Sequence, residues 1–430
     1  MNANARAAKA RGYAAFALFS IFTGILAGAA VWLVLRAINL GCRLLWEVFP
    51  QALGVAEGPL TAAYVVTACL VGGLLVGAAQ KRWGAYPQSL NAVMGSVKRT
   101  GRYEHNHLGR IAACALLPLV FGGSVGPEAG LTGIVAGLCT WAGDRLRHAG
   151  PQFREAASVG TAAVISAIFS APLFGLAAPL TGSCDGPDGE VRVTVPRATK
   201  VAVYLCAVAG ALGAMFALGS LFGRQGGLPR ISSLAIGGRE FAMLVPCALL
   251  GAAAGWAYHG FDHSARALDK RLGERPVLKG LLAGLGLGIC GALLPYTMFS
   301  GEEQTAQLAE AWTSMSALAL VATGFVKVLV TPLCLRLGWR GGHFFPVIFA
   351  GIALGYGCAL LSGADAGFCL CACTGALMGA VMRQPLMAVL LLFLCFPLKG
   401  APVMLAAAAL GSLVPLPKAW REAPEKTQGR

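Results

Sequence analysis

The amino-acid sequence predicts an all-α polytopic membrane protein, and three observations lead to this prediction. Of its 430 residues, 57% are hydrophobic and only 12% are charged, whereas a soluble domain carries about 25% charged residues. Several apolar stretches reach the roughly 20 residues that a helix needs to cross a bilayer. Other apolar stretches are interrupted by glycine and proline, and such breaks occur at membrane depth only where protein or a wet cavity surrounds the backbone.

Four stretches without any charged residue are predicted to cross the membrane, and they are residues 16–35, 61–79, 201–222 and 281–300. The first is long for the core of a signal peptide and no A-x-A site follows it, so we expect no cleavable signal. Arg6, Lys9 and Arg11 precede this stretch, which favours a cytoplasmic N-terminus. We therefore expect a multi-pass protein of the plasma membrane or cell inner membrane, in contact with membrane lipid.

The net charge of +15 and the fourteen cysteines each have a plain explanation in a membrane protein. Lysine and arginine in loops set topology against an anionic leaflet, so we expect no nucleic-acid partner. Positive charge also raises the local concentration of anions at a pore mouth. Cys369, Cys371 and Cys373 form a C-x-C-x-C run, but no flanking histidine or acid completes a metal site. They are predicted to be buried small hydrophobes, and neither a metal nor a cofactor is expected.

The interrupted stretches occur at similar places in two halves of the chain. Residues 111–141 contain "GGSVGP" (122–127), and residues 328–361 contain "GGHFFP" (341–346). "SAPLFG" (170–175) likewise resembles "RQPLMA" (383–388). We interpret this as a duplicated architecture, with chance similarity of short Gly/Pro motifs as the alternative. The predicted divisions are an N-terminal repeat at 1–222, a basic Gly-rich linker at 223–239, a C-terminal repeat at 240–416 and a polar cytoplasmic tail at 417–430.

Each Gly-Pro break is predicted to start a helix that attracts an anion. Proline suits the first turn of a helix, and the free amides there carry partial positive charge. Two such starts that meet at the midplane would hold a small anion on backbone amides without a fixed buried charge. The alternative is a pair of kinked helix junctions. The predicted anion-binding amides belong to Ser124, Val125, Gly126, His343, Phe344 and Phe345.

Glu128 follows Pro127 directly and therefore lies in the first turn of the predicted helix. An acid at this position caps free amides and complements the helix dipole. The second interpretation is a gate, in which the carboxylate competes with the anion for those amides.

"GGSVG" (122–126) also fits G-x-S-x-G, the nucleophile pattern of serine hydrolases. A nucleophilic serine needs a base, and His259, at the polar end of an apolar segment, is the best candidate. An intramembrane serine hydrolase that uses Ser124 and His259 stays a remote alternative, and we do not expect an enzyme.

The chain resembles the CLC family of chloride channels and proton-coupled chloride exchangers. "GGSVGPEAG" looks like the second signature of that family, "GGHFFPVIFAG" like the third, and "ISAIFSAPLFG" and "VMRQPLMAVLLL" like two further helices in the family's order. The resemblance implies a CLC-type fold with about 18 helices of uneven length in two inverted repeats. It also implies a homodimer with one pore in each subunit.

Departures from the family pattern shape the expected mechanism. "WGAYP" falls in the register of the first signature, so Gly84 stands where the family has a serine hydroxyl, and Tyr86 would lie at the inner side of the ion. Val125 stands at the position of the gating glutamate. The inner proton glutamate corresponds to Thr181 or Gly182. Lys399 is near the position of a central tyrosine that touches the anion, or is instead an interfacial lysine.

The resemblance therefore implies a passive, chloride-like anion channel that is not coupled to protons, with voltage-gated chloride channel activity as the family's function. Val125 cannot alternately bind a proton and compete with the anion, and Glu128 would be a displaced gate. The alternative is a proton-coupled exchanger that uses Glu128. Chloride, fluoride and nitrate all stay open as the anion. His343 either packs locally or adds pH dependence.

Overall fold

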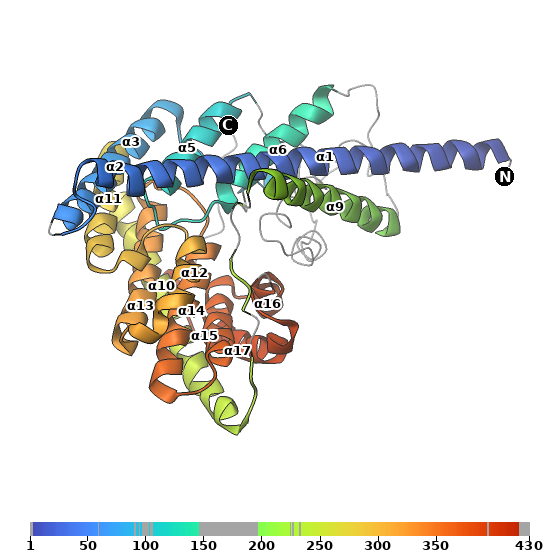
Figure 1. The fold of residues 1–430 in the computed structure, drawn as a ribbon. Coiled ribbons are helices and arrows are strands. Elements are labelled where there is room, and N and C mark those ends of the chain that lie inside the picture. The colour runs from blue at the N-terminus through green and yellow to red at the C-terminus, as the bar shows by residue number, and fades with distance from the viewer. Residues whose placement is uncertain are drawn as a thin grey trace.

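The computed structural model describes the chain except for residues 1–2, 59, 90–91, 94, 97–102, 104–105, 146–196, 224, 226–227, 232–233, 394 and 421–430. Over the described residues the protein is helical, and the only extended pairing there is an isolated antiparallel bridge between Gly126 and Gly342. The predicted all-α class is therefore confirmed (Figure 1). "SAPLFG" and the positions Thr181 and Gly182 lie outside the described residues.

The helices of the first half are uneven in length. α1 continues through a π-helical turn at Leu44–Val48 into the short α2. The bounds are α1 Ala3–Arg43, α2 Phe49–Ala52, α3 Leu60–Trp83, α5 Leu108–Val120, α6 Glu128–Arg145 and α9 Arg197–Phe222.

The helices described in the second half run from α10 to α17. Their bounds are α10 Gly238–Leu272, α11 Pro276–Leu293, α12 Glu302–Ala311, α13 Ala317–Arg336, α14 Phe344–Ser362, α15 Ala366–Met382, α16 Pro385–Leu392 and α17 Ala401–Leu413.

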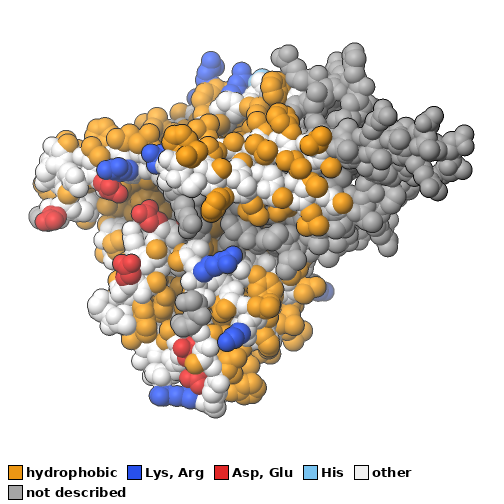
Figure 2. Space-filling view, turned by 45° about the vertical axis from the view of Figure 1, so that its right-hand side comes forward, with side chains coloured by type: hydrophobic (Ala, Val, Ile, Leu, Met, Phe, Trp, Pro, Cys, Tyr) orange, Lys and Arg blue, Asp and Glu red, His pale blue; other side chains and the backbone are white. Residues whose placement is uncertain are grey.

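Seven helical segments among the described residues are long and apolar enough to cross a membrane: Ser20–Ala52, Leu60–Trp83, Leu205–Phe222, Gly238–Leu272, Pro276–Leu293, Ala317–Arg336 and Phe344–Ser362. They confirm a multi-pass protein, and three of the four predicted stretches fall largely within them. Figure 2 shows hydrophobic side chains over much of the visible surface, as expected where lipid covers it. Leu18, Phe216 and Leu318 are among the large apolar residues that the described part of the chain exposes.

The span predicted at residues 281–300 is present, but its bounds were wrong, since the helix is Pro276–Leu293. α11 ends at Leu293, and Leu294 is not helical, with φ −136° and ψ 85°. Pro295 explains the break, because a proline disfavours helical geometry in the residue before it and has no N–H to continue the helix. Residues 295–297 then form a 3-10 turn in which Thr297 is buried.

The most deeply buried helices are α14 and α15, whose residues are enclosed by α10, α13 and α17 (Figure 1). Around this core, α1 lies beside α9, and α3 lies antiparallel to α11. α3 and α11 approach so closely at Gly73 and Gly280 that a Cβ on either glycine would overlap the carbonyl oxygen of the other.

We expect Gly280→Val to prevent normal folding, because its side chain would force α11 away from α3. Overpacking of this kind costs about 3 kcal/mol, and here the obstacle is backbone rather than a movable side chain. Gly213→Val on α9 is the matched control, since a Cβ there meets nothing within 4 Å. Thermal unfolding in detergent measures both variants. A melting curve for Gly280→Val that matches the wild type would contradict the close packing of α3 and α11.

Candidate functional site

The first interrupted segment leaves α5 after Val120 and turns back at Gly122, whose φ of +79° favours glycine. The Gly123 amide donates to the Pro118 carbonyl at 2.7 Å, and the Val125 amide donates to the Gly123 carbonyl at 2.8 Å. Pro127 then precedes α6, as predicted. Pro118, in contrast, lies inside α5 and does not interrupt it.

The second interrupted segment leaves α13 and turns at Gly338, whose φ is +98°. Trp339 is fully buried and anchors this turn, because its indole N–H donates to the Gly280 carbonyl at 3.0 Å. α14 begins at Phe344, with Pro346 in its first turn. Pro332 lies inside α13, so both breaks occur at the glycine-rich motifs and not at the earlier prolines.

The two segments meet through a pair of backbone hydrogen bonds. The Gly126 amide donates to the Gly342 carbonyl, and the Gly342 amide donates to the Gly126 carbonyl, both at 2.7 Å. The starts of α6 and α14 are therefore side by side, as the two-start hypothesis requires. The alternative of two unrelated kinks does not predict this pairing.

The Glu128 carboxylate lies on the first amides of α14. Its Oε1 accepts hydrogen bonds from the Phe344 amide at 2.8 Å and the Phe345 amide at 3.4 Å. The side chain is 1% exposed, and Oε2 has no hydrogen-bond partner among the described residues. Gly126 and Gly342 make room for the carboxylate, because a Cβ on either would overlap it. A carboxylate is itself an anion, so it lies where a helix start attracts negative charge.

Three further predicted amides, those of Ser124, Val125 and Gly126, are also engaged in this conformation. Val125 and Gly126 donate to the carbonyls of Gly123 and Gly342, and the Ser124 amide lies against the Cys334 sulfur. A free anion at this site therefore has to replace existing hydrogen bonds. Of these, the bonds from Phe344 and Phe345 to Glu128 are the ones that a rotation of the Glu128 side chain would break.

Two residues of α13 that sequence reasoning missed complete the surroundings. The Ser124 hydroxyl is 2.9 Å from the Thr331 hydroxyl, which in turn donates to the Lys327 carbonyl at 2.9 Å. Lys327 is fully buried, and its ammonium donates to the carbonyls of Thr297, Met298 and Phe299 at 3.1, 2.7 and 2.6 Å. A lone lysine inside an apolar span is a signal for a functional site that could have identified it.

Lys327 connects to the first interrupted segment through a single turn. The Phe299 amide donates to the Gly122 carbonyl at 2.8 Å. The Phe299 carbonyl is in turn one of the three that accept a hydrogen bond from the Lys327 ammonium. The Lys327 ammonium also lies 5.3 Å from the centre of the Phe349 ring on α14. One buried cation thus fixes the turn at 297–299 beside both helix starts.

Other predicted site residues lie elsewhere or make different contacts. Gly84 is exposed with φ +91°, and Tyr86 packs on a cluster that includes Tyr103 and Ile134. Lys399 is exposed in a 3-10 turn before α17. The His343 ring packs against the Phe344 ring in a tilted arrangement with 4.5 Å between centroids, and its centroid lies 6.2 Å from that of Tyr258. Roles for these residues in anion binding stay predictions.

The hydrolase alternative has no support in the geometry. The Ser124 hydroxyl pairs with Thr331, and Nε2 of His259 lies 3.1 Å from the Ala380 carbonyl. Neither contact joins the serine to the histidine, so the arrangement of nucleophile and base is not formed.

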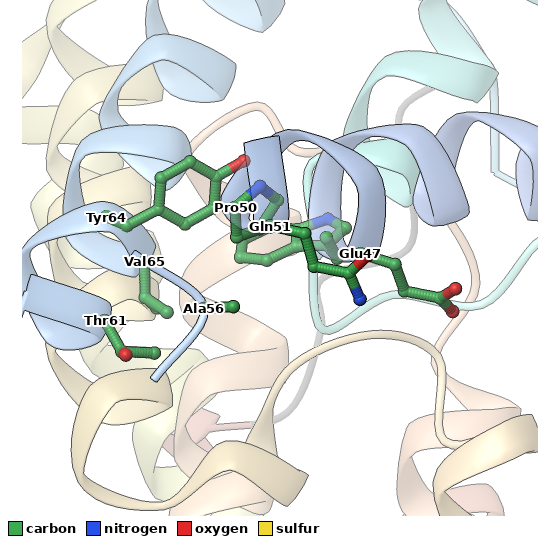
Figure 3. A pocket seen from close by; sticks show the side chains of 8 residues that line it. Glu47, Pro50, Gln51, Ala56, Thr61, Tyr64 and Val65 are labelled. Carbon is green, nitrogen blue, oxygen red and sulfur yellow. The ribbon is translucent and has the colours of Figure 1, made fainter. Parts of the chain in front are cut away.

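A cavity of about 170 Å³ opens between the π-helical turn with α2 on one side and the start of α3 on the other (Figure 3). Its lining includes Trp46, Glu47 and Tyr64. The Trp46 indole N–H donates to the Val120 carbonyl at 2.8 Å, and its ring meets Phe299 edge to face at 5.4 Å. The cavity wall is therefore in direct contact with the two turns that surround the helix starts.

Comparisons with known proteins show which families and proteins this chain resembles. Residues 72–415 match the family model described as voltage gated chloride channel. The chain is 27% identical over 359 residues to the protein named "Putative ion-transport protein YfeO" of Shigella flexneri, which covers 81% of this chain and 79% of that protein. The protein of the same name from Escherichia coli (strain K12 / DH10B) matches to the same extent.

Solved structures show the same fold at low sequence identity. A slow cyanobacterial Cl⁻/H⁺ antiporter aligns with a TM-score of 0.71 at 19% identity and 94% coverage of each chain. A CLC-type fluoride/proton antiporter aligns with a TM-score of 0.67 at 17% identity, with 93% of this chain and 95% of that chain covered.

Proposed function

Because this chain belongs to the voltage gated chloride channel family, whose members transport anions, we propose that it conducts a small anion passively and that Glu128 is its gate. The observation that carries this proposal is the Glu128 carboxylate on the amides of Phe344 and Phe345. An anion and the carboxylate compete for the same donors, so the side chain must leave before an anion binds there.

The unpartnered oxygen of Glu128 supports a gate over a permanent cap. A buried carboxylate oxygen without a donor costs free energy, and Oε2 of Glu128 has no partner among the described residues. In the closed conformation the carboxylate therefore lacks part of its hydrogen bonding, which makes it easier for a free anion to displace it from the amides of Phe344 and Phe345.

The charges beside the helix starts favour anions over protons. Lys327 is buried without an ion pair in the described part of the chain. Arg340, two residues before Gly342, has a buried Nε without a hydrogen-bond partner among the described residues. Both cations attract an anion and repel a hydronium ion. Val125, at the position of the family's gating acid, adds no proton carrier. These features support conduction without proton coupling.

Proton-coupled anion exchange is the second candidate function, and the ionisable carboxyl group of Glu128 also supports it. A carboxylate that competes with an anion can carry a proton when it leaves the amides, and Glu302 lies close enough to Glu128 to interact with it electrostatically. The solved relatives named as Cl⁻/H⁺ and fluoride/proton antiporters lend this candidate support.

The proposal extends to the setting of the protein. We place it in the plasma membrane or inner membrane with a cytoplasmic N-terminus, on the basic residues before the first span. A homodimer, the family's usual assembly, and chloride, fluoride or nitrate as the transported ion belong to the same proposal.

Flux through purified protein in liposomes separates the two candidates. We expect chloride, fluoride or nitrate to leave loaded vesicles when valinomycin supplies the countercurrent, while the internal pH stays constant. Empty liposomes give the leak rate. Proton movement against its gradient, driven by a chloride gradient, would show exchange and overturn passive conduction. Anion flux no greater than the leak would overturn both.

A further inference from the structure

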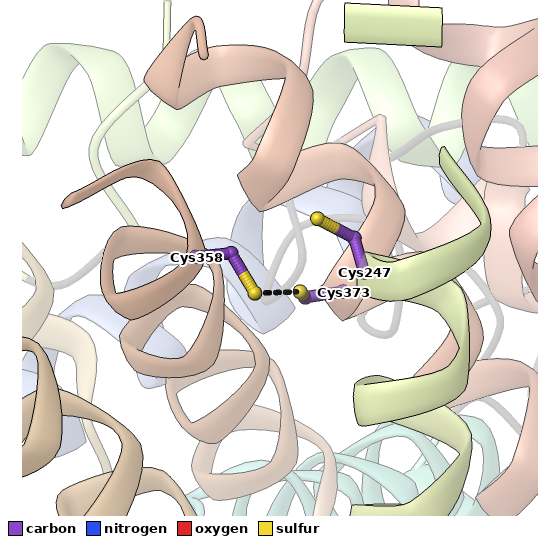
Figure 4. A group of neighbouring side chains, drawn as sticks. All are labelled: Cys247, Cys358 and Cys373. Atoms are coloured by element: carbon purple, nitrogen blue, oxygen red, sulfur yellow. Dashed lines mark hydrogen bonds between the residues drawn. The ribbon is translucent and has the colours of Figure 1, made fainter. Parts of the chain in front are cut away.

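Three cysteine thiols from three different helices converge in the buried half of the protein. Cys247 comes from α10, Cys358 from α14 and Cys373 from α15 (Figure 4). Their sulfur atoms all lie within 4.8 Å of one another, and the sulfurs of Cys358 and Cys373 are 3.8 Å apart. These residues are called the thiol cluster below.

The thiol cluster is closed to solvent and lies in rigid surroundings. Cys247 and Cys373 are fully buried, and Cys358 is 7% exposed. α10 packs against α15 closely enough that a Cβ on Gly251 would overlap the Cys373 carbonyl. α14 packs against α15 in the same way at Gly351 and Gly355. The backbones that carry the three sulfurs are therefore held in place before any ligand arrives.

The spacing and chemistry of the thiol cluster suit a soft metal ion. Metal–sulfur bonds of about 2.3 Å hold the three sulfurs of a trigonal site roughly 4 Å apart, close to the spacing here. Only sulfur is offered, and sulfur ligands select soft ions such as Cu(I). Zn²⁺ in structural sites takes four ligands. Cys369 contacts Cys247 but lies outside the set of mutually close sulfurs, so a fourth position is not completed.

We propose that the thiol cluster binds one soft monovalent metal ion of the Cu(I) class. Binding exchanges thiol protons for the metal, and these protons leave to solvent. A single positive charge suits an apolar interior better than a double one, because fewer thiolates must form and less charge is buried. The end of α14 is the expected side of entry, because Cys358 precedes Ser362 by one turn and, although buried, keeps more exposure (7%) than Cys247 and Cys373.

The thiol cluster is separate from the candidate anion site, although α14 carries both. Phe344 and Phe345 are at the first turn of α14, while Cys358 is near its last turn. A metal at the cluster joins α14 to α10 and α15, so we expect bound metal to raise the melting temperature. Because the cluster is far along α14 from the anion site, we expect no effect of the metal on proton coupling. The inference does not depend on whether the protein is a channel or an exchanger.

Cu(I) titration of the purified, reduced full-length protein under anaerobic conditions tests this site. Bicinchoninate competes for the metal, and elemental mass spectrometry counts the copper that stays with the protein. We expect one Cu(I) per chain, with affinity at least tenfold weaker in Cys358→Ala and Cys247→Ala. Cys371→Ala is the matched control, since this buried cysteine of α15 lies outside the cluster, and we expect its copper content to equal that of the wild type.

Thermal unfolding of the metal-free variants first establishes that each one folds. Copper retention in Cys358→Ala and Cys247→Ala equal to that in Cys371→Ala would overturn the proposal. So would retention of Zn²⁺ in preference to Cu(I) in a parallel titration, or a disulfide between Cys358 and Cys373 in the protein as purified, before any reductant is added. If either cluster variant fails to fold, Cys373→Ser, which keeps a side chain of similar shape, is expected to show the same loss of copper.

Discussion

Replacement of Glu128 by glutamine is expected to raise anion flux about tenfold. Glutamine keeps the shape of the side chain and one acceptor oxygen, but it loses the charge that makes hydrogen bonds to the Phe344 and Phe345 amides strong. Charge-assisted hydrogen bonds are roughly twice as strong as neutral ones, so an anion displaces the glutamine more readily. Chloride efflux from liposomes, followed with an ion-selective electrode, measures the change.

Two further variants sharpen the Glu128 prediction. Glu310→Gln removes a carboxylate from the exposed surface of α12, and we expect its flux to match the wild type. Glu128→Ala removes the acceptor altogether, which opens the path further but lowers stability by about 1 kcal/mol, as loss of a helix cap does. Unchanged or lower flux in Glu128→Gln would mean that the carboxylate is a permanent cap. Loss of proton movement in this variant would instead identify Glu128 as the proton carrier of an exchanger.

Replacement of Lys327 by methionine is expected to reduce anion flux at least tenfold and to destabilise the protein by about 2 kcal/mol. The ammonium supplies a buried positive charge beside the helix starts and three hydrogen bonds to the turn at 297–299. Methionine fills a similar volume but leaves these carbonyls without their donor, and each unsatisfied buried acceptor costs roughly 1–3 kcal/mol. Removal of a buried charge offsets part of this cost.

The electrostatic and structural parts of this effect are separable. Lys327→Arg keeps the charge and the donors, and we expect it to recover most of the flux. Lys279→Met removes an equivalent side chain that pairs with Asp269 at the half-exposed contact between α10 and α11, and its flux should match the wild type. Flux that is insensitive to Lys327→Met in folded protein would exclude an electrostatic role. Stability and flux are measured on the same preparations.

Local sequence was enough to predict the two helix starts. Glycines free the backbone to turn, and proline marks a first helical turn, so "GGSVGP" and "GGHFFP" each specify their own geometry without knowledge of the rest of the chain. Composition in the same way was enough to predict the membrane-spanning helices. It misplaced the end of the stretch at 281–300, because a count of apolar residues ignores Pro295, before which the helix ends.

The contacts between distant segments were not predictable from the sequence. Glu128 was expected to cap or gate its own helix start, yet its carboxylate crosses to the amides of the opposite start. That contact depends on the relative placement of α6 and α14. Thr331 and the convergence of Cys247 with Cys358 depend on tertiary packing in the same way. Lys327 differs, because its isolation within an apolar segment is visible in the sequence itself.

The paired glycines at 126 and 342 hold the two helix starts at a distance that main-chain hydrogen bonds determine. Only main-chain atoms form this pair of hydrogen bonds, so peptide geometry sets the distance between the two helix starts as long as both positions stay glycine. If the anion site is as proposed, substitutions at Ser124, Val125 and His343 are expected to change the preference for one anion over another, while the distance between the helix starts stays the same. Changes in anion selectivity are therefore expected to arise from side-chain substitutions around this fixed pair of backbone hydrogen bonds.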